Sequence, residues 1–167
     1  MSALNQKMQW LLLAVLLGLG GCGFHLKGYQ QASPDLDGLF IEQAVEGGAL
    51  AGVIRQQLLV SDVKLSDSAE QAKSVLRILQ ERFSQRVLSV DANGKVLEYE
   101  LLLEASFSVS RAGAQELPTP QHLELTRQLA FSGSDELSRR NEAELMHNDM
   151  LTDMANQIIR QLQAQLK

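Results

Sequence analysis

The single cysteine of this chain, Cys22, is its most reactive side chain and lies close to the N-terminus. Lys7 makes the start of the chain positive, residues 10–19 are apolar apart from one glycine, and Leu19-Gly20-Gly21 forms a small-residue cleavage site. A membrane-spanning helix needs about 20 apolar residues, so this run is too short to be one. The pattern predicts a cleaved signal peptide over residues 1–21, with the thiol of Cys22 as a point of covalent attachment.

The stretch Leu19-Gly20-Gly21-Cys22 resembles a bacterial lipobox. In a lipobox the cysteine thiol is acylated, and cleavage then makes the cysteine the first residue of the mature protein. The alternative is a secreted protein with a free thiol in an oxidising compartment. Two or more acyl chains anchor a protein stably, because each buried methylene contributes ~0.8 kcal/mol. Gly23, with no Asp after Cys22, resembles the sorting pattern for the outer membrane. We expect an N-acyl diacylglycerol group on Cys22, no other cofactor, and a tether to the outer membrane.

Histidines in this chain form no constellation typical of catalysis or metal binding. His25, His122 and His147 are far apart in the sequence, and none has a second ligand at metal-site spacing. No nucleophile elbow, phosphate-binding loop or zinc-protease motif occurs. We therefore predict a protein that is not an enzyme and that holds no metal.

Basic residues gather in the second half of the chain, where they predict an anion site. Arg139 and Arg140 are adjacent, in a stretch expected to be a loop before the last helix, and Lys95 directly follows an Asn-Gly turn. The planar donor fork of arginine suits phosphate. The alternative interpretation is that these are ordinary solubilising charges at the ends of strands.

Length and charge limit the class of protein. The 167 residues less the first 21 leave 146, the size of one domain. The net charge of −5 becomes −6 without the signal peptide, because that segment contains Lys7 and no acidic residue. A chain this acidic is unsuited to nucleic acid, for which a basic face dominates affinity. We expect a lipidated leader over residues 22–38 and one globular domain over residues 39–167.

Apolar spacing predicts two helices. The first covers about residues 49–60 and carries Leu50, Val53, Ile54, Leu58 and Leu59 at helical spacing. The second begins at Asn141, whose side chain together with Glu144 resembles a capping box. Its apolar stripe is predicted to pack in the core, and consists of Met146, Met150, Leu151, Met154, Ile158, Leu162 and Leu166.

Alternating residues predict the strands, with segments at 39–41, 63–65, 75–90, 97–109 and 123–131. Asn93-Gly94 predicts a hairpin, because both residues tolerate a positive φ. Residues 97–109 alternate most clearly, which requires one buried and one solvated face. Two helices on one side of a mostly antiparallel sheet bury both apolar faces, so the predicted fold class is α+β.

Three segments carry a resemblance to a known family. They are Cys22-Gly23-Phe24-His25-Leu26-Lys27-Gly28, the hairpin from Ser89 to Leu101, and the stretch from Arg139 to Leu162. Together they are similar to the lipopolysaccharide-assembly lipoprotein family, LptE. The resemblance extends over nearly the whole chain, and the first of the three segments is the most specific.

The resemblance implies a four-stranded sheet covered by two helices, and a plug that fills the large outer-membrane β-barrel LptD in a 1:1 complex. The pair would deliver lipopolysaccharide to the outer leaflet. The resemblance also implies that basic residues at the hairpin tip and before the last helix contact lipopolysaccharide phosphates. Arg139 matches the second position and Arg140 follows it, whereas Ala92 stands where a basic residue is expected in the hairpin, with Lys95 just beyond.

Two rival functions remain open at this point. One is a subunit of another envelope-assembly machine, which differs only in its partner. The other is a lipoprotein hydrolase that uses Glu98, Glu100 and Glu104, which share one strand face. The alternative for these three carboxylates is an ordinary solvated face of the sheet.

Overall fold

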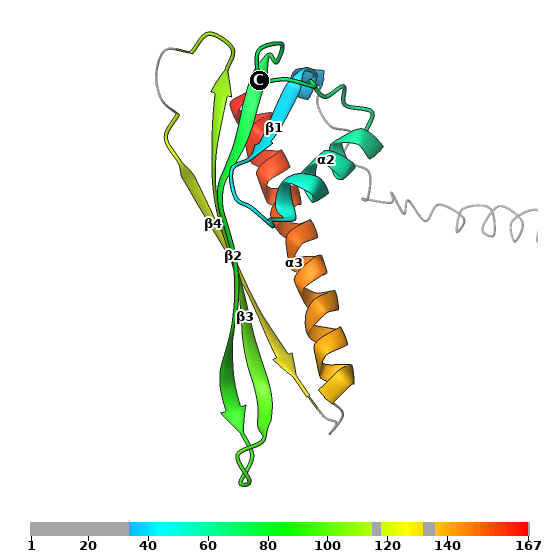
Figure 1. Cartoon of the computed structure of the whole chain (residues 1–167), viewed down its shortest axis with the longest axis vertical. Helices are drawn as coiled ribbons and strands as arrows, with labels where there is room; N and C mark the ends of the chain where they lie inside the picture. The colour runs from blue at the N-terminus through cyan, green and yellow to red at the C-terminus, as the bar shows by residue number, and fades with distance from the viewer. Residues whose placement is uncertain (1–33, 115–117, 132–135, 167) are drawn as a thin grey trace, which may run out of the picture. The chain divides into compact units, whose positions relative to one another are not determined.

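The order of the elements follows the local sequence signals closely (Figure 1). The computed structural model describes residues 34–114, 118–131 and 136–166; the predicted signal peptide, Cys22 and most of the predicted leader lie outside them. In chain order the elements are η1 (Pro34–Leu36, a 3-10 turn), β1 (Leu39–Gln43), α2 (Leu50–Val60), β2 (Ser74–Val90), β3 (Val96–Arg111), β4 (Gln121–Ala130) and α3 (Glu136–Gln165). Leu36, within the range assigned to the leader, is fully buried in the core.

The four strands form one sheet in the order β1-β2-β3-β4. β1 runs parallel to β2, and the other two pairs are antiparallel. The parallel pair arises because α2 connects β1 to β2 and so returns the chain to the same end of the sheet. The predicted α+β class is confirmed, and the parallel pair is an added detail.

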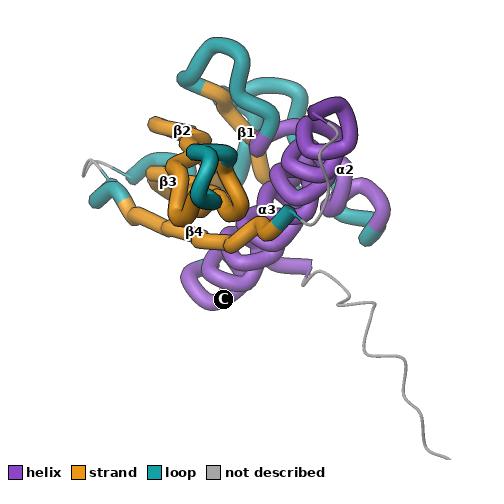
Figure 2. The backbone as a smooth tube through the Cα atoms, turned by 90° about the horizontal axis from the view of Figure 1, so that it is seen from below, coloured by secondary structure: helices purple, strands orange, loops and turns teal. Residues whose placement is uncertain are grey.

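Both helices cover the same face of the sheet (Figure 2). α2 contacts β1, β2 and α3, and α3 contacts β3 and β4. On α3 the first fully buried side chain is Met150, and burial then recurs at Met154, Ile158 and Leu162. The prediction that the apolar stripe of this helix packs in the core is confirmed for these residues.

The central strand β3 shows the predicted alternation. Leu101, Leu103 and Phe107 are fully buried against the helices. On the opposite face Ser106 and Ser108 retain only 6% and 3% exposure, although the pattern predicted a solvated face there. Both side chains are short and stand beside longer neighbours, Ser106 between Gln80 and His122 and Ser108 next to Arg77, which accounts for the difference.

The first turn of α2 is capped by side chains from the sheet. One carboxylate, that of Glu81 on β2, accepts hydrogen bonds from the backbone N–H groups of Ala49 at 3.0 Å and Leu50 at 3.1 Å. The amide oxygen of Gln43 on β1 accepts from the N–H of Ala51 at 3.1 Å. These acceptors satisfy donors that have no partner within the helix. They also join α2 to the strands on which it packs.

Two sequence predictions are wrong. Residues 63–65 form no strand; Lys64 O accepts a single backbone hydrogen bond from Gly38 N–H at 2.7 Å, and the next residue along, Ser66, donates its N–H to Leu39 O at 2.9 Å. The last helix begins by Glu136 and not at Asn141. Residues 136–140 contain no helix breaker, and an exposed Asn inside a helix costs only about 0.7 kcal/mol relative to alanine. Arg139 and Arg140 therefore lie in the first turns of α3 and not in a loop.

Candidate functional site

The sheet face opposite the helices is uncovered and polar. We call it the open face. Its members follow from the strand alternation and register, and most of them are polar; the apolar members are Phe40, Val75, Leu102 and Ala130. The residues are Phe40 and Glu42 on β1, Val75, Arg77, Gln80, Arg82, Ser84 and Arg86 on β2, Glu98, Glu100, Leu102, Glu104, Ser106, Ser108 and Ser110 on β3, and His122, Glu124, Thr126, Gln128 and Ala130 on β4.

Charge on the open face is divided between strands. The arginines lie on β2, and the carboxylates lie on β1, β3 and β4. Arg86 pairs with Glu100 at 2.8 Å, while Arg82, Glu104 and Glu124 stand in one row across the sheet. On β1, Glu42 also pairs with Arg77 at 2.8 Å, so the result is a largely polar surface on which the arginines of β2 face carboxylates of the neighbouring strands.

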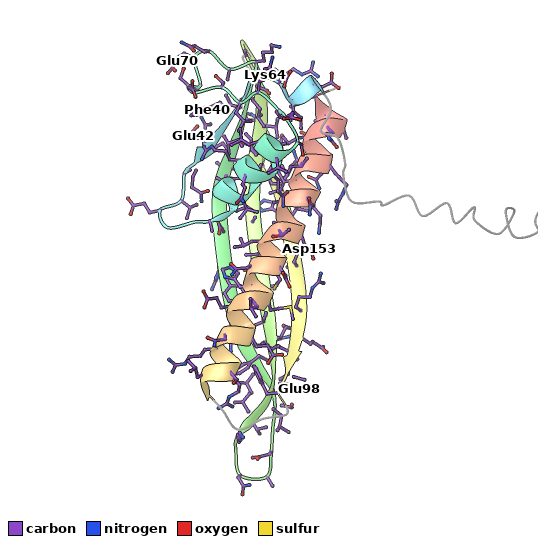
Figure 3. The ribbon with its side chains drawn as sticks, turned by 90° about the vertical axis from the view of Figure 1, so that its right-hand side faces the viewer. Phe40, Glu42, Lys64, Glu70, Glu98 and Asp153 are labelled. Carbon is purple, nitrogen blue, oxygen red and sulfur yellow. The ribbon has the colours of Figure 1, made fainter. Side chains whose placement is uncertain are left out.

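The three glutamates of the rival hydrolase interpretation lie on this face but are engaged differently. Glu100 pairs with Arg86, and Glu98 accepts a 2.6 Å hydrogen bond from the hydroxyl of Ser89. Glu98 lies near the hairpin end of β3 (Figure 3). Within the described residues, none of these three carboxylates shares an enclosed site with a second acid–base group, as general acid–base catalysis requires. The arrangement fits a charged surface better than an active site.

Arg127, which interrupts the apolar pattern of β4, has a structural partner. It lies on the helix-covered face opposite Leu101, and its guanidinium donates to the carboxylate of Asp153 at 2.7 Å. Asp153 projects from α3 (Figure 3). The ion pair links β4 to α3 and explains why a basic residue occupies the covered side.

Lys95 lies in the predicted hairpin turn. The N–H of Asp91 donates to the carbonyl of Lys95 at 2.8 Å, so the predicted hairpin is present; Gly94 adopts a φ of +80°, whereas Asn93 does not adopt the positive φ that the Asn-Gly signal allows. One carboxylate oxygen of Asp91 accepts from the N–H groups of Asn93 and Lys95 at 2.8 and 2.9 Å. These backbone hydrogen bonds, from Lys95 first, lower the pKa of Asp91. The carboxylate of Asp91 thus stabilises the turn to which Asp91 itself belongs.

Arg139 is positioned by an aromatic pair that the sequence did not single out. Its guanidinium carbon lies 5.9 Å from the centre of the Phe131 ring, a cation–π geometry. Phe131 meets Tyr99 edge to face at 5.7 Å, and its N–H donates to the carbonyl of Leu97 at 2.9 Å. The first turns of α3 are thereby fixed beside β3.

The predicted anion-binding residues consequently gather at one end of the sheet. Lys95 lies in the turn directly before β3 and four residues before Tyr99, which is at most about 13 Å along the chain. Arg140 is exposed on α3 directly after Arg139. We call Lys95, Arg139 and Arg140 the basic end. In the sequence, only the alternating apolar pattern that ends at Phe131 could have indicated that an aromatic side chain contacts Arg139.

A second contact between α3 and the sheet also escaped the sequence analysis. The His147 ring stacks on Phe83 of β2, with centroids 4.0 Å apart and an interplanar angle of 26°. Burial lowers the pKa of His147, and the charges of Glu81 and Glu144 partly oppose that shift. Its Nε2 atom is buried without a hydrogen-bond partner in the described part of the chain. Uncharged histidine is therefore the form that packs here.

Neither a metal site nor a membrane-spanning helix occurs within the described ranges. No cluster of three or more His, Cys, Asp or Glu side chains there could hold a metal ion. Similarly, none of the helices described is both long and apolar enough to cross a bilayer.

Comparison with known families gives a match over most of the folded region. The model of the lipopolysaccharide-assembly family LptE matches residues 37–162. The chain belongs to the LptE family. It is 32% identical over 161 residues to the LPS-assembly lipoprotein LptE of Yersinia enterocolitica, covering 93% of this chain and 77% of that protein. The LptE protein of Yersinia pestis gives the same identity and coverage.

Solved structures of lipoproteins share the LptE-like fold. The rare lipoprotein B of Shewanella oneidensis superposes with a TM-score of 0.66 at 26% identity, covering 76% of this chain and 94% of that one. A lipoprotein B from Nitrosomonas europaea gives a TM-score of 0.69 at 28% identity, covering 85% and 91%. The family and fold predicted from sequence are both confirmed.

Proposed function

We propose that this LptE-family chain is a non-enzymatic subunit of the lipopolysaccharide-assembly machinery, tethered to the outer membrane by lipid on Cys22. Family membership over residues 37–162 carries this proposal. The relatives are named LPS-assembly lipoproteins, which favours this role over another envelope machine. The paired carboxylate of Glu100 gives no support to the hydrolase alternative.

The partner we propose is a large LptD-like β-barrel, with one lipoprotein seated in its lumen. The open face supports this choice. Wide barrels have polar interiors, so a flat polar sheet face can exchange water contacts for matching polar contacts on the wall. A lipid anchor at the start of the chain would raise the effective concentration of the domain near the membrane that holds the barrel.

The ligand we propose for the basic end is the phosphate region of lipopolysaccharide. Arg139 is held by Phe131, so less side-chain entropy is lost when it binds an anion. Arg140 and Lys95 would add charge at the same end of the sheet. Together these cations can replace divalent ions that bridge neighbouring phosphates.

Charge reversal tests the proposed phosphate contact. In the full-length lipoprotein, Arg139→Asp with Arg140→Asp is expected to weaken binding of purified lipopolysaccharide at least tenfold, because two attractions become repulsions. The matched control is Arg160→Asp, an exposed arginine farther along α3 that should leave binding unchanged. Thermal unfolding of each variant checks that the fold persists. Equal binding by the double variant and the control would remove both arginines from the site.

A further inference from the structure

The strand β4 leaves one long edge of the sheet without a partner. It is the last strand in the order β1-β2-β3-β4, and within the described residues no strand follows on its outer side (Figure 2). The N–H of Phe131, directly after β4, donates to the carbonyl of Leu97, so the odd-numbered residues of β4 direct their backbone groups toward β3. The even-numbered residues are exposed and direct their N–H and C=O groups outward. They are His122, Glu124, Thr126, Gln128 and Ala130.

The opposite side of the sheet is protected against further pairing. Along the outer side of β1, the carbonyl of Leu39 accepts from the N–H of Ser66, and the carbonyl of Ile41 accepts from the guanidinium of Arg55 at 3.2 Å. Beyond β1, the free side of β2 belongs to a strand whose pairing is shifted between residues 78 and 80 and again between 87 and 90. Covering groups and irregular pairing are the devices by which proteins block their sheet edges.

The edge of β4 has none of these protections. Its pairing with β3 runs without a register shift from Gln121 to Ala130, and the strand contains no proline or lysine. Its one arginine, Arg127, lies on the helix-covered face and pairs with Asp153. A long regular edge accepts added strands readily, because its backbone donors and acceptors are already aligned. The edge of β4 is therefore the place where a further strand can pair.

Charge along β4 indicates what kind of strand fits. Glu124 lies directly opposite Glu104 on β3, and like charges directly opposite each other destabilise a sheet. In the described part of the chain, neither carboxylate belongs to an ion pair. Arg82 follows in the same row on the β2 side of Glu104, so Glu124 is the carboxylate at the outer edge. An added strand with a basic residue opposite Glu124 supplies the cation that this edge lacks.

We propose that the edge of β4 binds an extended, basic segment of the barrel partner by strand addition. This rests on the proposed function, because it specifies how the same partner is held. The side chains of the outward residues belong to the open face, so the edge and the open face form one continuous surface.

The occupant is a segment inside the barrel lumen. A closed barrel has no free strand edge, so this segment is a loop or a terminal extension and not a strand of the wall. A second copy of this chain fits the edge less well, because it brings another Glu104 and Glu124 to a site that already has both.

Removal of one outward N–H tests strand addition in the full-length lipoprotein. Thr126→Pro removes an N–H that faces away from β3, whereas Thr126→Val keeps it beside a side chain of similar size. We expect Thr126→Pro to lower recovery of the barrel from detergent-solubilised outer membranes about tenfold, because a carbonyl of the partner loses its donor. Thr126→Val should leave recovery unchanged. Equal recovery with both variants would overturn the proposal.

Amide hydrogen exchange tests the same contact without any substitution, so it decides the matter even where Thr126→Pro fails to fold. In the purified complex, the N–H groups of Glu124, Thr126 and Gln128 should exchange at least about tenfold more slowly than in the lipoprotein alone, because they gain acceptors. The same exchange rates in both samples would show that no strand is added.

Glu124→Lys tests the charge of the added segment. Lysine opposite Glu104 replaces a repulsion by an attraction, so the free lipoprotein should unfold at a higher temperature. Recovery of the barrel should nevertheless fall about tenfold, since the basic segment now meets a cation. The matched control is Glu46→Lys, at an exposed position between β1 and α2, which should leave recovery unchanged. Full recovery with Glu124→Lys would overturn the choice of a basic segment.

The outcomes separate strand addition from the docking on which it rests. A barrel recovered equally with the unchanged protein and with Thr126→Pro would retain docking of the open face and reject strand addition. No barrel with the unchanged protein would reject both. A dimer of the purified lipoprotein that Thr126→Pro dissociates would show that a second copy, and not the barrel, occupies the edge.

Discussion

His147 is a titratable side chain that the fold holds in its neutral form. Its ring stacks on Phe83, and burial lowers its pKa below the value near 6.5 that an exposed histidine has. Between the folded and unfolded pKa values the unfolded chain binds more protons. Stability therefore rises with pH in that window and falls on acidification through about pH 6.5.

We expect His147→Phe, which keeps an aromatic ring against Phe83, to reduce the loss of thermal stability between pH 7.5 and pH 5.5. His122→Gln is the control, because that histidine is exposed on the open face. Unfolding temperatures of the three full-length proteins across this range provide the measurement. An equal pH slope in the His147→Phe variant and the unchanged protein would show that His147 is not the titrating group.

The residues of the basic end differ in how far sequence could place them. Lys95 was located correctly because Asp91, Asn93 and Gly94 encode the turn locally. For Arg139 the residue type alone suggested an anion contact, and the predicted loop position is wrong; its contact with Phe131, which in turn meets Tyr99, depends on how β4, α3 and β3 meet. No local pattern records such a contact, which is why the aromatic support was missed.

Among the elements, α2 depends on a cap supplied from outside its own sequence. Its N-cap residue Ala49 makes no side-chain cap, and Glu81 and Gln43 act in its place. A search for capping residues among the sequence neighbours of α2 cannot find these acceptors, because they lie on two strands of the sheet. The same restriction explains the wrong start predicted for α3. The residues that resemble a capping box at Asn141 lie inside the helix.

Gly48 tests the cap of α2. A Cβ atom at this position would overlap the side-chain amide of Gln43 and approach the carboxylate of Glu81. Gly48→Ala should therefore displace both acceptors and lower the free energy of unfolding by about 1–2 kcal/mol, as loss of a helix cap does.

The neighbouring Gly52→Ala is the matched control. Gly52 lies inside α2 with open space around its Cα, so alanine should raise the free energy of unfolding by about 0.5–1 kcal/mol. Denaturant unfolding measures both variants. Equal changes of the same sign in the free energy of unfolding would show that the contacts around Gly48 do not determine the effect of Gly48→Ala.

Across the whole molecule, the layer arrangement was predictable and the strand order was not. Alternation in β3 required one covered face, and two apolar helices had to cover it. The parallel pairing of β1 with β2 depends on the path of α2, which apolar spacing does not encode. As a result β1 begins beside Ser74, while the basic end lies near the opposite end of β2, about 55 Å along its 17 residues.

Docking of the open face against a large outer-membrane barrel is the interaction on which the proposed function depends. Its most direct test is affinity purification of the full-length protein from detergent-solubilised outer membranes, with a variant carrying Ser84→Trp and Thr126→Trp. These two residues flank Leu102 across the open face, whereas a control, Gln56→Trp, alters an exposed position on α2. We predict a stoichiometric barrel with the unchanged protein and the control, and at least a tenfold loss with the double variant. Recovery of the unchanged lipoprotein without any barrel would show that this docking does not occur.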